Sequence, residues 1–215
     1  GLSFIKLMLD RSGSAPLEMM IFSNKIKPNT IEDLGLHCRR CHTLYINYSL
    51  LSSILPQFDR SETLETLTVG RSGVHDPEPI PLGLQQTISN CPALRRLELT
   101  SCQVQWDRLQ AAFPSLKALY LSGLRIHGEE NLDSSPGLYE SLSSMPLLED
   151  LSLDDVLPSD LSSSTRLKPP LFLASMTYLS ITETQAHPVA LFFIHHLCPK
   201  HSDDSRRPRI LGPAG

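Results

Sequence analysis

The sequence lacks the motifs by which common enzyme classes are recognised. It contains no G-x-S-x-G, no H-E-x-x-H and no G-x-x-x-x-G-K-[ST]. The paired carboxylates Asp154-Asp155 and Asp203-Asp204 lie in polar, turn-like sequence without a partner that would tune their pKa. We therefore expect a protein that is not an enzyme and that needs no cofactor.

The chain also lacks an excess of basic residues and a long apolar run. It has 19 Lys and Arg against 23 Asp and Glu, a net charge of −4, so nothing favours a nucleic-acid partner. Its longest apolar stretch, 189–197, is interrupted by His195 and His196 and is far shorter than the roughly 20 residues that span a bilayer. We expect neither a nucleic-acid partner nor a membrane partner.

Cysteine is scarce and odd in number. Five cysteines cannot all pair within one chain, which argues against the disulfide framework of a small secreted protein. Small thiols suit buried positions instead, and we expect that role for Cys41, Cys91 and Cys102. An intracellular location, cytoplasmic or nuclear, follows as the expectation.

What the chain does have is a recurring phrase, L-x-x-L-x-L. One copy means little, because any amphipathic segment can contain it, but several copies at a similar spacing indicate a leucine-rich repeat, whose period is roughly 20–29 residues. The middle apolar residues are separated by 23, 30, 22, 32 and 28 positions. The clear copies begin at Leu94, Leu116 and Leu148, looser copies begin at Cys41, Leu64 and Met176, and a degenerate copy begins at Pro16.

The segments before the three clear copies carry apolar residues at helical spacing. These are 83–92, 106–114 and 137–146, each ending at or beside a proline, which cannot continue a helix. Helix and strand thus alternate, and neither can bury its apolar face alone. We predict an α/β leucine-rich-repeat solenoid, or horseshoe, with parallel strands on the concave face and short helices on the convex face.

The predicted domain organisation is a single repeat domain over residues 1–215. Its spacing corresponds to about six or seven repeats, and the first residue, Gly1, suggests a fragment of a longer protein. Residues 183–215 form an irregular C-terminal part, in which 209–212 resembles the beginning of one more, truncated repeat.

Two stretches resemble a known family. The string from Cys91 to Cys102 is similar to the cysteine-containing repeat C-P-x-L-x-x-L-x-L-x-x-C, a subtype typical of the substrate-binding part of F-box proteins. The opening 9–18 resembles the segment that follows the F-box in mushroom-type fungal F-box proteins. The resemblance implies a substrate receptor of a ubiquitin ligase. The F-box itself is absent from this chain, so a cullin-ligase adaptor is expected to bind only through an F-box outside it.

Two clusters have the composition of a metal site. Cys38-x-x-Cys41 is flanked by His37 and His42, but a structural zinc site needs a second ligand pair, and the repeat core also requires Cys41. The second cluster, His195-His196-x-Cys198-x-x-His201, has the alternative interpretation of a polar helix end. We assign no metal ligands from the sequence.

The remaining candidate site is a surface. In each strand the L-x-L residues point into the core, so the residues between them point the other way and line the concave face. Tyrosine is favoured at binding surfaces because it combines apolar area with a polar tip, although it also suits strands in general. The partner-binding residues predicted on this face are Tyr45, Arg96, Glu98, Tyr120, Asp150, Asp154 and Tyr178.

The sequence therefore predicts a module for protein–protein interaction. The role implied by the resemblance is substrate recognition by an F-box-type ubiquitin-ligase receptor. The alternative is a leucine-rich-repeat scaffold of a non-ligase regulatory or immune-type receptor. A basic partner segment is expected at the C-terminal half of the face, where Asp150 and Asp154 lie.

Overall fold

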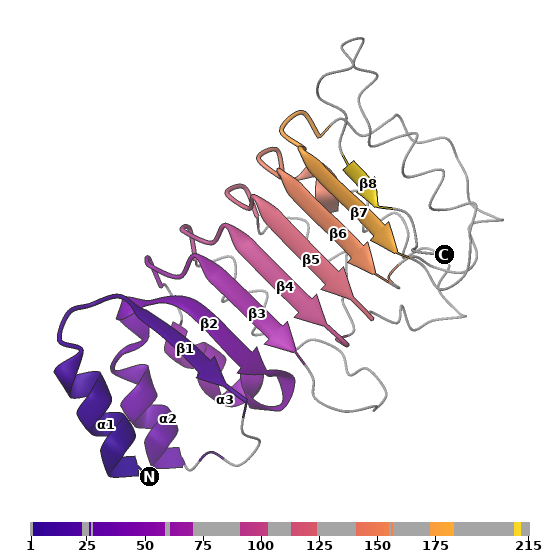
Figure 1. Ribbon diagram of the computed structural model, residues 1–215. Coiled ribbons are helices and arrows are strands. Elements are labelled where there is room, and N and C mark those ends of the chain that lie inside the picture. The colour runs from indigo at the N-terminus through magenta and orange to yellow at the C-terminus, as the bar shows by residue number, and fades with distance from the viewer. Residues whose placement is uncertain are drawn as a thin grey trace.

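One parallel sheet runs through the whole structure. The computed structural model describes residues 2–22, 26, 28–58, 61–70, 91–102, 113–123, 141–154, 156, 173–182 and 209–211. Eight strands lie side by side in sequence order, each parallel to the next (Figure 1). They are β1 (Leu17–Ile21), β2 (Cys41–Asn47), β3 (Thr66–Gly70), β4 (Arg96–Thr100), β5 (Ala118–Ser122), β6 (Asp150–Asp154), β7 (Tyr178–Thr182) and β8 (Arg209–Leu211).

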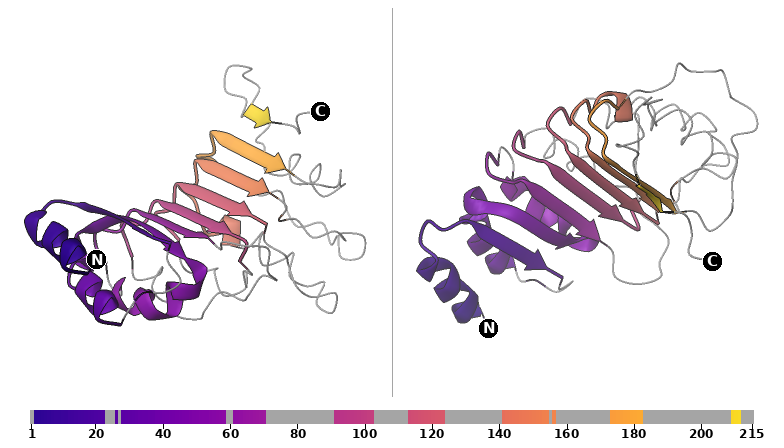
Figure 2. Two further views of the ribbon diagram at one scale, coloured as in Figure 1. Left: turned by 60° about the horizontal axis from the view of Figure 1, so that its bottom comes forward. Right: turned by 45° about the horizontal axis from the view of Figure 1, so that its top comes forward.

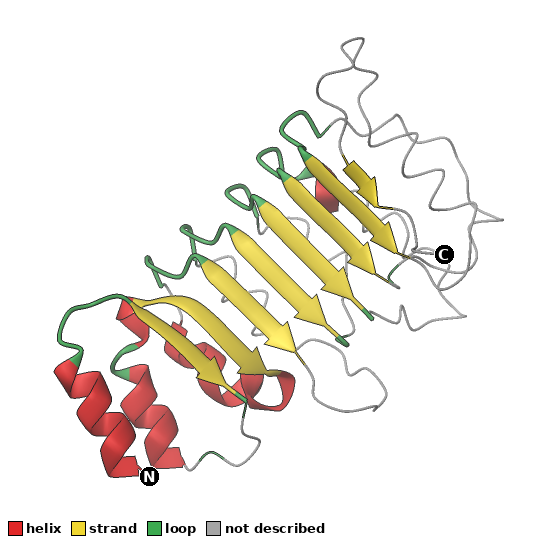
Figure 3. Cartoon of the chain, in the orientation of Figure 1, coloured by secondary structure: helices red, strands yellow, loops and turns green. Residues whose placement is uncertain are grey.

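Most of the described helices gather at the N-terminal end of the sheet (Figure 3). The α-helices α2 and α3 lie on one side of the sheet (Figure 2). The helices are α1 (Leu2–Arg11), α2 (Pro28–Gly35), η1 (Cys38–Arg40), η2 (Tyr48–Leu50), α3 (Leu51–Ile54) and η3 (Leu55–Phe58), where η marks a 3-10 helix. This is the predicted α/β solenoid of the leucine-rich-repeat type.

The helices predicted further along the chain are described only in part. Residues 141–143 are helical, within the helix predicted over 137–146. The helices predicted over 83–92 and 106–114 lie outside the described residues, apart from the last two positions of each, as does most of the C-terminal part.

The inward residues of the strands form two columns. In the first, Leu44, Leu67, Leu97, Leu119, Leu151 and Leu179 are paired strand to strand, and all are at most 2% exposed. In the second column Ile46, Val69, Leu99, Leu121, Leu153 and Ile181 are buried in the same way. Residues from α3 and η3, such as Leu51 and Phe58, pack into the same core. Each repeat therefore covers the apolar face of its neighbour, as a solenoid requires.

A tight turn starts every repeat from β4 to β7. The backbone N–H of Leu94, at the third position after Cys91, donates to the Cys91 carbonyl at 3.0 Å. The same bond recurs at Leu116, Leu148 and Met176, over 3.1–3.3 Å. Three of the four turns have proline immediately after the acceptor residue, where its fixed φ suits a turn. Each of the dipeptides Cys91-Pro92, Phe113-Pro114 and Met145-Pro146 thus begins a turn that leads the chain into the next strand.

A second ladder of hydrogen bonds runs just before the strands. The carbonyl of Glu65 accepts the N–H groups of Arg95 and Arg96, at 2.8 and 3.0 Å. The carbonyls of Arg95, Lys117 and Glu149 each accept two N–H groups from the following repeat in the same way. These bonds extend the sheet pairing by one residue and fix the relative position of neighbouring repeats.

Arg40 ties α1 to the first full repeat. Its guanidinium donates to the carbonyls of Leu9 and Ala15, each at 3.3 Å, to the carbonyl of Gly13, and to the hydroxyl of Ser12 at 3.1 Å. The Leu9 carbonyl belongs to the last turn of α1, where the helix dipole favours a positive charge. One side chain thus satisfies the carbonyls at the end of the helix and in the turn that follows it.

We expect Arg40→Ala to loosen the N-terminal end without unfolding the stack. Hydrogen bonds to a charged group contribute about 1.5–3 kcal/mol each, so a local loss of about 2 kcal/mol is a modest expectation. That corresponds to about 30-fold faster amide exchange in residues 8–15 if exchange follows local opening. The matched control is Arg39→Ala, because Arg39 is exposed and adjacent. Equal exchange in the two variants would show that Arg40 does not hold α1.

Candidate functional site

The residues that alternate with the inward ones along each strand form the opposite surface of the sheet, which we call the open face. It comprises three rows of residues in β1–β7, and strand pairing aligns the central row as Met20, Tyr45, Thr68, Glu98, Tyr120, Ser152 and Ser180. This is the face that the sequence predicts to be concave. The sequence order and register of the pairs are those expected from the L-x-x-L-x-L spacing.

Three of the predicted site residues meet at the middle of the open face. The guanidinium carbon of Arg96 lies over the ring of Tyr120, 4.3 Å from the ring centroid. Arg96 also forms an ion pair with Glu98, with 3.6 Å between Nη2 of the guanidinium and Oε2 of the carboxylate. Ala118 is the strand partner of Arg96. Because the Ala118 side chain is small, the guanidinium can extend past it to Tyr120. Arg96 is thereby held between a carboxylate and an aromatic ring, a cation–π geometry.

Asp150 and Tyr178 continue this cluster toward the C-terminus. Asp150 pairs with Ala118 on one side and with Tyr178 on the other. Burial raises the pKa of the Tyr120 hydroxyl, while the charge of Arg96 lowers it and the neighbouring Asp150, Tyr178 and Glu98 raise it. Five of the seven predicted residues therefore interact as one group, which we call the central cluster (Arg96, Glu98, Tyr120, Asp150 and Tyr178).

The other two predicted residues lie apart from the central cluster. Tyr45 is two strands away from Glu98, with Thr68 between them. Asp154 lies on β6, four residues beyond Asp150, and one oxygen of its carboxylate accepts the Ser122 hydroxyl at 2.8 Å. The structure thus places all seven residues on the open face but gathers only five of them.

Four residues of this face are less exposed than the alternation along the strands predicts. Asn47, Ala118 and Ser180 are buried, at 5%, 8% and 9% exposure, instead of lining an accessible surface. The Asn47 side chain turns back to accept the Ser49 backbone N–H at 3.1 Å and so begins η2. Tyr120 is half-buried under Arg96 and not a freely exposed ring. A stacked ring costs less to order on binding than a mobile one, because its position is already fixed.

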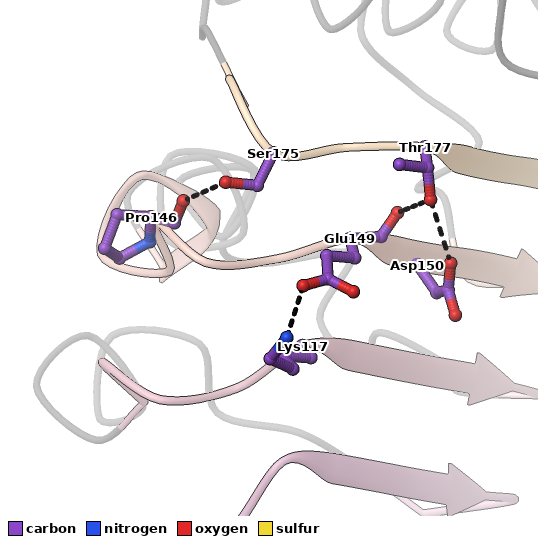
Figure 4. Close-up of polar contacts among 6 residues, drawn as sticks. All are labelled: Lys117, Pro146, Glu149, Asp150, Ser175 and Thr177. Atoms are coloured by element: carbon purple, nitrogen blue, oxygen red, sulfur yellow. Dashed lines mark hydrogen bonds and ion pairs between the residues drawn. The ribbon is translucent and has the colours of Figure 1, made fainter.

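Several polar contacts beside the open face were not predicted from the sequence. Lys117 and Glu149, at the start of neighbouring strands, form an ion pair with 2.5 Å between Nζ and Oε1 (Figure 4). Thr177 donates its hydroxyl to the Glu149 carbonyl at 3.3 Å, and Ser175 donates to the Pro146 carbonyl at 3.1 Å (Figure 4). The sequence does contain a pointer to the ion pair, since Lys117 and Glu149 occupy the same position of successive repeats.

The cysteine–histidine cluster near residue 40 has its polar atoms engaged within the chain. The thiols of Cys38 and Cys41 donate to the carbonyls of Leu34 and Thr43 at 3.3 and 3.1 Å. Burial raises the pKa of Cys38 to about 12 and that of Cys41 to about 11, so both thiols are protonated at neutral pH. His42 donates through Nδ1 to the Leu17 carbonyl at 2.8 Å.

These side chains therefore hold β1, β2 and the preceding turn together. Among the described residues, no group of three or more His, Cys, Asp or Glu is arranged to hold a metal ion. The cluster at His195, Cys198 and His201 lies outside the described residues, as do Asp155, Asp203 and Asp204. Within the described part of the chain, no helix is both long and apolar enough to cross a membrane.

No protein-family model matches the chain, and no curated protein matches it. What is established is the repeat architecture: one parallel sheet in sequence order with short helices.

The ionisation of Tyr120 tests the central cluster directly. Arg96 lowers the Tyr120 pKa, so Arg96→Gln should raise it further, whereas Asp150→Asn should lower it because a repelling charge is removed. Tyrosinate absorbance near alkaline pH measures both shifts, with Tyr120→Phe identifying which of the transitions belongs to this residue. The same titration curve in the parent and in Arg96→Gln would mean that the guanidinium does not lie over the ring.

Proposed function

We propose that this chain is a protein-binding module that engages its partner on the open face. The observation that carries the proposal is the central cluster, which combines two tyrosines, an arginine and two carboxylates on a sheet surface. The described helical residues that pack against the sheet, such as Leu51, Phe58 and Leu142, join the buried columns on the opposite side of the strands. Tyrosine and arginine are enriched in the energetically dominant parts of protein interfaces.

The rigidity of the support favours the same function. Each of the strands β4–β7 is fixed by sheet pairing on both sides, by the ladder of carbonyls before the strands and by the buried leucine columns behind it. Arg96 and Tyr120 already hold each other in place. A surface ordered before binding loses little conformational entropy when a partner docks.

The more specific proposal is substrate recognition within an F-box-type ubiquitin ligase. Its support is the resemblance of 91–102 to the cysteine-containing repeat of F-box proteins and of 9–18 to the segment that follows an F-box in mushroom-type fungal proteins. Both repeat cysteines, Cys91 and Cys102, are buried, at 4% and 0% exposure, as a core role for them requires. The cullin-ligase adaptor would bind an F-box outside this chain.

We expect Tyr120→Ala to abolish capture of the partner while leaving the fold intact. Central aromatic residues contribute about 2 kcal/mol or more to an interface, which is about 30-fold in affinity. Removing the cation–π contact should cost the free protein only about 0.5–1 kcal/mol of stability. The measurement is chemical crosslinking and capture from extracts of the source cells, with thermal unfolding of each variant alongside.

Leu36→Ala is the matched control for this experiment, because Leu36 is a 79% exposed apolar side chain remote from the open face. If both variants retain every partner of the parent, the binding site is not on the open face. For the ligase role, the captured partner should persist longer in cells that lack the full-length protein. The full-length protein should also co-purify with the cullin adaptor. A captured partner with an unchanged lifetime would favour the regulatory-scaffold alternative.

A further inference from the structure

The charges on the open face are unequally compensated. Across β1–β7 this face carries one basic side chain, Arg96, and four acidic ones, Glu18, Glu98, Asp150 and Asp154. Arg96 contacts Glu98, and the Glu149 carboxylate beside the face contacts Lys117. Asp150 and Asp154 differ from these, because no basic side chain whose position the structure describes lies within 4.0 Å of either carboxylate. The same holds for Glu18 on β1, so two of the three acidic side chains without a basic partner lie on one strand, β6.

The surroundings of Asp150 suit an incoming cation. Tyr120 and Tyr178 lie on the two sides of it, and both Asp150 and Tyr178 are close enough to Tyr120 to raise the pKa of its hydroxyl. Between Asp150 and Asp154 the open face is formed by Ser152, whose neighbour in β7 is Ser180. Small serine side chains beside two tyrosines and a carboxylate can accept the alkyl stem and charged end of a lysine or arginine.

The opposite end of the open face has a different character. Met20 and Phe22 are 59% and 65% exposed, although they are large and apolar. Met20 pairs with Tyr45, so the three side chains give β1 and β2 an apolar surface on the same face as the central cluster. Exposed apolar groups gathered at one place commonly mark an interaction site.

We propose that the open face binds a protein segment that crosses the strands, with apolar residues at Met20 and Phe22 and a lysine or arginine at Asp150. This proposal rests on the proposed function and specifies the partner's chemistry. From β1 to β6 there are five inter-strand steps of about 4.8 Å, or about 24 Å in all. An extended segment spans this with about seven residues and a helical one with about 16.

The test is selection from a random library of displayed 20-residue peptides, long enough for either conformation. Peptides enriched on the parent chain should contain lysine or arginine more often than the unselected library does. Their apolar residues should lie about seven positions from the basic residue in an extended peptide, or about 16 positions in a helical one. Selection on the double variant Asp150→Lys, Asp154→Lys should instead enrich acidic peptides. Enriched peptides without a basic excess, or no enriched peptide at all, would overturn the proposal.

One enriched peptide, synthesised with a fluorescent label, then provides affinities. Asp150→Lys should weaken its binding tenfold or more and reverse its salt dependence, because attraction at this position becomes repulsion. Glu32→Lys is the matched control, since it makes the same charge change at an exposed residue of α2. Equal effects of the two substitutions would show that only net charge matters and that Asp150 is not the site.

Two further variants separate the possible failures. Arg209 pairs with Tyr178 through its backbone, so it is the nearest basic residue on the neighbouring strand. If basic peptides are enriched only after Arg209→Gln, the chain fills its own site and the proposal is wrong. If the selected peptides lack basic residues yet fail to bind Tyr120→Ala, the open face still binds protein and only the partner's charge was misassigned. Peptides that bind every open-face variant equally would overturn both proposals.

Discussion

The structure depends on one constraint: apolar residues alternate with other residues along each strand, so the strand buries only one of its two faces. The leucine at the middle of each L-x-x-L-x-L is almost completely buried, and its counterparts in the flanking repeats cover it. A single repeat has no such cover, so no unit is stable alone. Once the inward residues are committed to the core, pairing in register follows, because a slip of one residue would turn every leucine toward solvent.

The same constraint creates the surface available for function. Residues that alternate with the leucines are free to vary in chemistry, since the core does not need them. In this chain they comprise an acidic and an exposed apolar residue, Glu18 and Met20, at β1, small and neutral residues at β3, and aromatic and charged residues among those of β4–β7. Arg96 connects the two requirements: its guanidinium covers Tyr120 and neutralises Glu98, and the small Ala118 between them makes the contact possible.

The sequence predicted the fold well because its information is periodic. The spacing of the leucines correctly assigned the strands, their parallel order and the pairing that places Glu98 beside Tyr120 and Tyr120 beside Ser152. Proline in three of the four turns marked where those strands begin. The degenerate first copy was also correct, since Met19 and Ile21 are buried in β1.

What the sequence did not show are contacts that depend on three-dimensional direction. Arg40 reaches residues about 30 positions earlier, and nothing in its local sequence distinguishes it from the exposed Arg39. The stacking of Arg96 on Tyr120 is a diagonal contact, and it depends on which way a long side chain leans. Asn47 occupies a strand position by sequence, but its short amide side chain hydrogen-bonds locally and begins the next helix. Each of these requires coordinates, because spacing alone assigns a face and not a contact.

Carboxyl-group footprinting of the free and partner-bound chain tests the central claim most directly. If the partner docks on the open face, Asp150 and Asp154 lose reactivity when it binds. The exposed carboxylates of Glu32 and Glu62, which lie off that face, should react equally in both states. Protection of Glu32 and Glu62 with unchanged reactivity at Asp150 and Asp154 would contradict it, because the partner would then dock away from the open face.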